Sequence, residues 1–86
     1  MKHPRVYFRK LGRERADGQA VELGRKKYIE IDPTIRGKRL LEVFIHERLH
    51  FIFPELNEEG VENAALTLSD FLWKHNYRQM DNELAE

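Results

Sequence analysis

The chain has 86 residues and no cysteine, and its Lys and Arg balance its Asp and Glu at 15 each. This length allows one domain with a modest core, and an apolar content of 41% fits a folded chain better than a disordered one. The absence of cysteine excludes disulfides and thiolate metal sites, and no apolar run approaches the roughly 20 residues of a membrane-spanning helix. We therefore expect a single soluble, cytoplasmic domain over residues 1–86, with a flexible tail at 78–86 and no membrane partner.

The charges are divided between the two halves of the chain. Residues 1–40 contain twelve Lys and Arg against five Asp and Glu, whereas residues 41–86 contain three against ten. A basic half is compatible with nucleic-acid contact. We favour instead two oppositely charged halves that attract each other in the fold, because the aromatic residues of the first half fit strand alternation as well as base stacking.

Three strands are predicted in the first half of the chain. Residues 5–11 are rich in β-formers, residues 19–23 alternate weakly, and residues 27–32 alternate clearly, with Ile29 and Ile31 on one face. Residues 12–18 are charged and flanked by Gly, which indicates a loop, and residues 24–26 form a tight connection. Short connections between consecutive strands favour an antiparallel meander.

Two helices are predicted after the strands. The first runs from Gly37 or Lys38 to Phe53 and is apolar around most of its circumference, so we expect it to be central and buried on several sides. The second begins after an N-cap at Asn57 and runs to about Lys74 or His75. Its predicted core stripe consists of Val61, Ala65, Leu68 and Leu72, joined by Ala64 and Phe71. The predicted fold class is α+β, a three-stranded antiparallel sheet followed by two packed helices.

Residues 46–50 spell His-Glu-Arg-Leu-His, a His-Glu-x-x-His pentad inside the first predicted helix. Side chains four residues apart stand on one face of a helix, so His46 and His50 can bind one zinc ion together. Glu47 then lies beside the metal, where a base is needed to take a proton from water. The pattern indicates a zinc-dependent hydrolase, and the alternative is an amphipathic helix with two surface histidines. The preceding strand, the apolar helix and the acidic helix start that follows favour the metal site.

A catalytic zinc site needs a third protein ligand, and the carboxylates at the start of the second helix are the candidates. Only residues 54–57 separate the helices, so a helical hairpin should bring this region back to His50. We choose Glu59, because Asn63 lies four residues later on the same face and can hold a ring nitrogen of a metal-bound histidine. The other candidates, in order of preference, are Glu62 and Glu58.

These residues resemble the gluzincins, the zinc peptidases that use two His and one Glu as ligands. Residues 56–61 resemble the Asn-Glu-Gly-aromatic segment of aminopeptidases in this class, with one extra Glu. Residues 59–63 resemble the Glu-x-Ile-x-Asp helix of thermolysin, with Asn in place of Asp. The small ImmA/IrrE-like and SprT-like families have a similar compact core. The resemblance covers residues 28 to 73 and departs from the class in the short spacing between His50 and Glu59.

The resemblance implies a zinc-dependent metallopeptidase with a minimal zincin core. In this interpretation His46, His50 and Glu59 bind Zn²⁺, Glu47 is the general base, and Asn63 supports a histidine ligand. The substrate is a peptide or protein. One alternative is a non-catalytic zincin-like module, with or without metal, that binds a protein partner. Another is a nucleic-acid-associated SprT-like protease that uses the basic half.

Two further roles follow from the proposed peptidase chemistry. The resemblance implies that residues 27–32 form the edge strand along which an extended substrate aligns. A donor is also required to stabilise the oxyanion. The first set of candidates is His75, Tyr77 and Arg78, but His75 lies roughly 24 Å along the helix from Glu59. Tyr28 or Tyr7 from the sheet reaches the site more easily, although packing within the sheet is the simpler role for both.

Overall fold

The computed structural model describes residues 2–11 and 17–79. In this part of the chain the strands are β1 (Arg5–Phe8), β2 (Gly18–Leu23) and β3 (Lys26–Ile31), and the helices that follow are α1 (Gly37–Ile52) and α2 (Glu58–Lys74). The order confirms the α+β class. Most of the predicted loop at 12–18 and most of the predicted tail at 78–86 lie outside the described residues.

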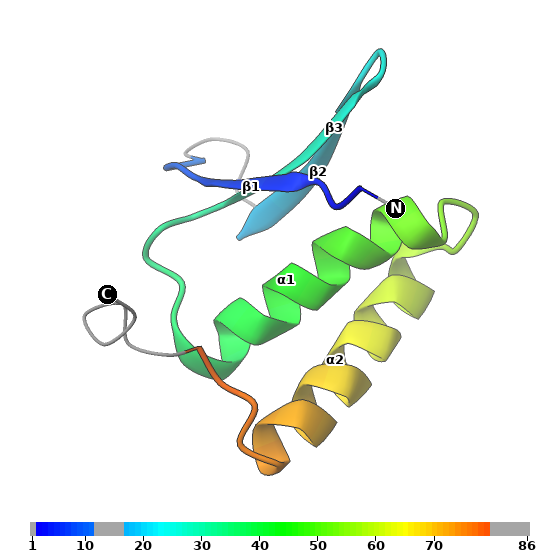
Figure 1. Ribbon diagram of the computed structural model, residues 1–86. Helices are drawn as coiled ribbons and strands as arrows, with labels where there is room; N and C mark the ends of the chain where they lie inside the picture. The colour runs from blue at the N-terminus through cyan, green and yellow to red at the C-terminus, as the bar shows by residue number, and fades with distance from the viewer. Residues whose placement is uncertain (1, 12–16, 80–86) are drawn as a thin grey trace.

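The sheet is mixed, with the strand order β1-β3-β2 (Figure 1). Strands β2 and β3 form an antiparallel hairpin that turns at Gly24, whose φ is 59°. Strand β1 pairs with β3 in parallel, from Arg5 opposite Tyr28 to Phe8 opposite Ile31. The prediction of a purely antiparallel sheet is therefore wrong. Strand β2 begins opposite the last residue of β3, with Gly18 opposite Ile31, and the tight turn at Gly24 returns the chain so that β3 inserts between β1 and β2.

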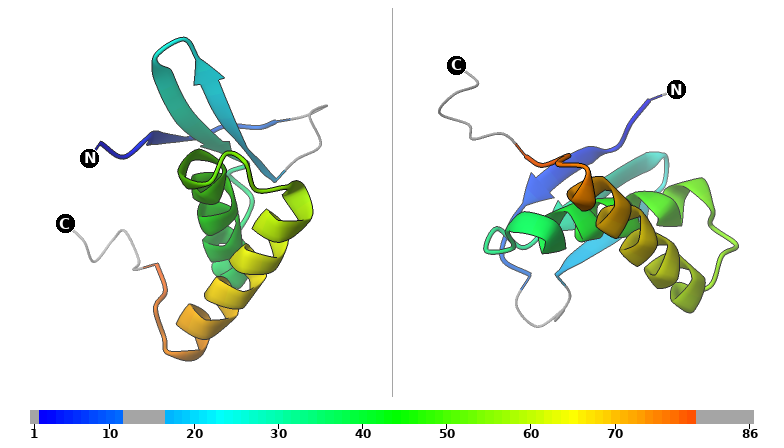
Figure 2. Two further views of the ribbon diagram at one scale, coloured as in Figure 1. Left: turned by 90° about the vertical axis from the view of Figure 1, so that its right-hand side faces the viewer. Right: turned by 90° about the horizontal axis from the view of Figure 1, so that it is seen from below.

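Both helices lie on the same side of the sheet, and α1 lies between the sheet and α2 (Figures 1 and 2). Helix α1 contacts β2 and β3, whereas α2 contacts α1 and none of the three strands. One buried cluster joins α1 to the sheet, and its members are Ile29, Ile31, Leu40 and Val43. A second joins α1 to α2, and its members are Leu49, Val61 and Ala65. The two clusters confirm that α1 is the central helix.

Helix α2 begins as predicted, because the Asn57 side chain caps it by accepting the N–H of Gly60 at 2.7 Å. Its buried face differs from the predicted one. Leu68 and Phe71 are 44% and 59% exposed, whereas Ser69 is fully buried. The contact with α1 follows the four-residue spacing from Val61 through Ala65 to Ser69. The buried Ser69 hydroxyl is satisfied because it donates to the carbonyl of Leu66 at 3.1 Å.

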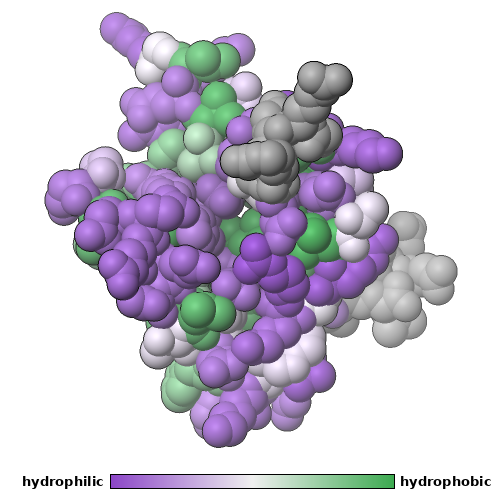
Figure 3. Space-filling model, turned by 180° about the vertical axis from the view of Figure 1, so that it is seen from behind, coloured by the Kyte–Doolittle hydropathy of each residue, from purple (hydrophilic) through white to green (hydrophobic). Residues whose placement is uncertain are grey.

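The face of the molecule behind the view of Figure 1 is mostly polar. Seen from behind, hydrophilic residues cover most of the molecule, and apolar residues show only in small areas between them (Figure 3). Across residues 2–11 and 17–79, no helix combines the length and the apolar character needed to cross a bilayer.

Candidate metal centre

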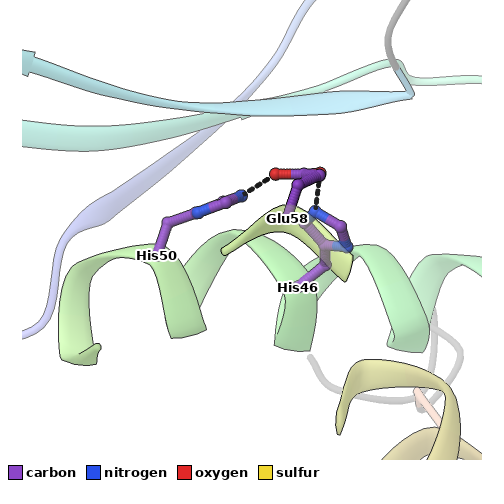
Figure 4. Close-up of side chains that lie close together, drawn as sticks. All are labelled: His46, His50 and Glu58. Atoms are coloured by element: carbon purple, nitrogen blue, oxygen red, sulfur yellow. Dashed lines mark hydrogen bonds and ion pairs between the residues drawn. The ribbon is translucent and has the colours of Figure 1, made fainter. Parts of the chain in front are cut away.

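His46 and His50 lie one turn apart on α1, on the side facing β2 and the start of α2 (Figure 4). Their ring centroids are 5.0 Å apart. The Glu58 carboxylate reaches both rings, with Oε2 at 2.9 Å from His46 Nε2 and Oε1 at 3.2 Å from His50 Nε2. These three residues each offer a ligand atom within 4.8 Å of the others, and they are the one such group among the described residues. The structure thus brings together the two predicted histidines and one of the three candidate carboxylates.

The carboxylate that reaches the histidines is Glu58 and not Glu59. Glu58 is the first residue of α2, directly after the Asn57 cap, where the chain returns from the end of α1. Both residues are exposed, but Glu59 is rotated by about 100° around the helix from Glu58 and is not part of the group of ligand atoms at the histidines. Asn63, predicted to support a histidine, is also exposed and makes no hydrogen bond to either ring in the described structure. Glu58, the least preferred of the three candidates from the sequence, is therefore the carboxylate placed to act as the third ligand.

The three donors fit a zinc ion. Two imidazole nitrogens and one carboxylate oxygen form a donor set that zinc accepts in catalytic sites. The two Glu58 oxygens each approach a different ring, at 2.9 and 3.2 Å, and all three residues offer ligand atoms within 4.8 Å of one another. An ion bound between them would replace these two direct contacts. All three side chains remain partly open to solvent, so an ion can enter.

Glu47 lies between the two histidines in the sequence and is buried, with 7% of its surface exposed. It lines both cavities beside the histidines. Burial raises the pKa of this carboxyl, and the nearby Glu58 raises it further. His46, a hydrogen bond from the backbone of Ala20 and the more distant Arg39 oppose the rise without cancelling it. A carboxylate whose proton affinity is increased in this way is a stronger base than an exposed Glu.

Strand β2 forms the wall opposite α1. Gly18 allows this close approach, because a Cβ there would lie 2.7 Å from Val43 Cγ1 and 3.4 Å from Glu47 Cγ. The cavity of about 400 Å³ between β2 and α1, which we call the metal-side cavity, has in its lining Gln19, Ala20, Glu22, His46, His50 and Phe51. Because the strand order is β1-β3-β2, the strand beside the site is an edge of the sheet and β3 is central. The expectation that residues 27–32 form the edge strand is therefore wrong, and β2 holds that position.

Arg39 also borders the site, although it is not among the residues predicted from the sequence. It lines a cavity of about 290 Å³ together with His46, Glu47, Glu58 and Glu62. Its guanidinium lies 2.6 Å from Asp17 Oδ2 and 3.0 Å from Glu42 Oε2. Burial lowers the pKa of Arg39, but these hydrogen bonds outweigh it and hold the pKa above its ordinary value. The spacing of seven residues to His46, which places both on one helix face, could have identified it.

None of the predicted oxyanion donors is among the residues that line the two cavities at the histidines. His75 and Tyr77 lie at the C-terminal end of α2, whereas Glu58 is at its beginning. Tyr7 and Tyr28 pack edge to face, with ring centroids 5.7 Å apart. They lie on the sheet face opposite the helices, because side chains alternate along a strand and Ile29 packs on α1. The packing role is the one that the structure gives to both tyrosines.

Comparison of the chain with protein-family models, with curated proteins and with solved structures finds no match.

Proposed function

We propose that this protein is a zinc-dependent peptidase. The observation that carries the proposal is the convergence of His46, His50 and Glu58 beside the buried carboxyl of Glu47. A structural hydrogen-bond network would explain the two histidines and Glu58, but it leaves unexplained a buried acid whose pKa is raised at the same cavity. Buried acids with raised pKa values occur preferentially at catalytic sites, where a base must hold a proton during the reaction.

Each residue of the cluster has a distinct role in the proposed reaction. His46, His50 and Glu58 would hold the ion, which when bound makes water more acidic and polarises a carbonyl group. Glu47 accepts the proton of the attacking water and passes it to the leaving amine. The hydrogen bond from Ala20 keeps this carboxyl on the β2 side of the cavity while it does so. The chain thus supplies the ligands and the base from one helix and the first residue of the next.

The position of β2 favours a peptide substrate. An edge strand has unpaired backbone groups along its outer side, and an extended peptide can pair with them. Strand β2 runs along the metal-side cavity from Gly18, beside Glu47, to Leu23. A peptide paired with this edge passes the histidines in an extended conformation, which exposes its backbone carbonyls to the site.

Metal analysis and peptide cleavage test the proposal together. Purified protein is loaded with Zn²⁺, dialysed, and assayed for bound metal and for cleavage of an unfolded, fluorescently labelled protein. We expect the unmodified protein to retain zinc and to cleave. Glu47→Gln should retain zinc and lose at least about 100-fold in rate, because the base is gone. His50→Ala should lose both, and Glu55→Gln, at an exposed residue between the helices, should lose neither.

Two results contradict the proposal in different ways. If the unmodified protein retains no zinc, the cluster is a hydrogen-bond network and not a metal centre. If it retains zinc through His50 but cleaves nothing, the site belongs to a non-catalytic module that binds a protein partner.

A further inference from the structure

A second cavity, of about 330 Å³, adjoins the metal-side cavity and is lined by basic residues. We call it the cationic pocket and define it by Lys2, Arg25, Lys27, Arg48 and Phe51. No Asp or Glu is among the described residues that line it. Four side chains that are positively charged at neutral pH therefore surround one concave surface, and such an arrangement attracts anions.

The cationic pocket and the metal-side cavity share one wall. Phe51, one residue after His50, lines both of them. Lys27 also lines the cationic pocket, and its ammonium group lies over the Phe51 ring, 5.7 Å from the ring centroid. Glu22, the cross-strand partner of Lys27, lines the metal-side cavity instead. An anionic group that enters the pocket is thus one aromatic ring away from the candidate metal centre.

Strand β2 leads from the metal centre to this pocket. It begins at Gly18, beside Glu47, and ends at Leu23, just before the hairpin turn that carries Arg25. An extended chain advances about 3.3 Å per residue. A peptide paired with β2 and positioned for cleavage at the histidines would therefore place a side chain about two to four residues from the scissile bond beside Lys27 and Arg25.

The opposite end of the site has a different charge. The cavity there contains the carboxylates of Asp17 and Glu62, and its guanidinium, Arg39, is already paired with Asp17 and with Glu42. Glu62 has no ion pair in the described structure. The two ends of the proposed substrate path therefore differ in charge. Cationic side chains lie beyond Phe51, and carboxylates lie on the far side of His46.

We propose that the cationic pocket binds an acidic side chain of the substrate, and that the protein prefers peptides with Asp or Glu about two to four residues from the scissile bond. This inference rests on the proposed peptidase function. Nucleic acid is the other polyanion that four cations could attract. The shared Phe51 wall and the direction of β2 favour a substrate side chain, since both connect the pocket to the place where a peptide would be cut.

Cleavage of a peptide library tests the preference. The zinc-loaded protein is incubated with random decapeptides blocked at both ends, and mass spectrometry identifies the cleavage sites. We expect Asp and Glu to be enriched about tenfold at one position on one side of the cut, the size expected from a few partly exposed ion pairs acting together. The double variant Arg25→Gln, Lys27→Gln should lose this enrichment but still cleave uncharged peptides. High salt should weaken the enrichment in the unmodified protein.

Lys26→Gln is the matched control, because Lys26 lies on the same hairpin but its side chain points to the opposite face of the sheet from Lys27. It removes one positive charge from the hairpin, as Lys27→Gln alone does, and should leave the preference unchanged. Cleavage without acidic enrichment contradicts the inference, and so does enrichment that survives in the double variant. Either result leaves the peptidase function standing, whereas absence of all cleavage refutes that function.

Binding separates the pocket from catalysis. Fluorescence anisotropy of the zinc-loaded Glu47→Gln variant is measured with a labelled peptide rich in Asp and Glu and with its Gln counterpart. Tighter binding of the acidic peptide, lost on adding Arg25→Gln and Lys27→Gln, supports the pocket. Equal binding of the two peptides refutes it. A labelled single-stranded oligonucleotide that binds through Arg25 and Lys27 while the acidic peptide does not also refutes it, in favour of a nucleic-acid site.

Discussion

Glu58 and Glu59 are adjacent in the sequence, but the structure gives them different surroundings. Both are exposed, but Glu58 lies 2.9 and 3.2 Å from the two imidazoles, whereas Glu59 is not part of the group of ligand atoms there. We predict that Glu58→Gln weakens zinc binding at least about tenfold, because an amide oxygen is a poorer zinc ligand than a carboxylate. Glu59→Gln removes the same charge from the same helix turn and should change the affinity less than about twofold. Titration with a competing zinc indicator measures both, and a larger loss in Glu59→Gln would restore the sequence-based choice.

The sequence could identify the histidines but not the carboxylate. The spacing of His46 and His50 fixes their common face once α1 is a helix, so local geometry is sufficient. Which of two consecutive glutamates faces them depends on the angle at which α2 leaves the turn after Phe53, and that angle depends on packing between the helices. The preference for Glu59 relied on Asn63 as a supporting residue, and Asn63 is exposed.

Glu47 should make metal-free protein less stable at neutral pH than at acidic pH. Its pKa is raised in the folded state, chiefly by burial, so its contribution to stability is complete below the unfolded pKa near 4.5 and is lost as pH rises through the folded value. We predict that Glu47→Gln, with metal removed, is more stable than the unmodified protein at pH 8 and that the difference disappears near pH 4. Urea unfolding at both pH values measures it, with Glu59→Gln as the control for a lost charge. A variant that is less stable at pH 8 would mean that the ionised carboxyl is favoured where it lies.

The contact between strand β2 and helix α1 depends on the absence of a side chain at Gly18. An added Cβ would lie 2.7 Å from Val43 Cγ1 and 3.2 Å from the carbonyl oxygen of Glu30. We predict that Gly18→Ala costs about 1–3 kcal/mol of unfolding free energy through overpacking. Combination with Val43→Ala, which removes the clashing methyl group, should cost less than the sum of the two single changes. Denaturant unfolding of the four proteins measures the coupling, and strict additivity would show that Val43 is not the obstacle.

The helices were easier to predict than the order of the strands. Asn57 as the cap of α2 and Pro54 after the end of α1 are local features, and both helices end within a residue or two of the predicted positions. The pairing of β1 with β3 is a contact between segments about twenty residues apart, as from Arg5 to Tyr28, and no local pattern encodes it. The same pairing decides which strand is the edge, so the location of the proposed substrate path also depends on it.

In the folded molecule, the basic residues of the first half of the chain are only partly paired with the acidic residues of the second half. The Lys38–Asp70 ion pair links α1 to α2, and Arg39 pairs with Glu42. Arg9 instead pairs with Glu30 within the first half, at 2.5 Å. Mutual attraction of the halves therefore accounts for part of the pattern. Basic residues of the hairpin also gather in the cationic pocket, together with Arg48 of α1.

Helix α2 touches no strand and is held to the rest of the molecule through α1 alone, so a metal ion at its first residue would add a second attachment. We predict that zinc at 100 times its dissociation constant stabilises the fold by about 2.7 kcal/mol, which for a domain of this size raises Tm by about 10–20 °C. Thermal unfolding with zinc and with a chelator measures the shift, and His46→Ala, His50→Ala should abolish it. Hydrogen exchange locates the effect, because the amides of Gly60 and Val61, which donate to Asn57, should gain the most protection on zinc binding. Protection spread evenly over the chain, or confined to the sheet, would mean that the ion binds elsewhere, since ligation by Glu58 would stabilise this turn of α2 in particular.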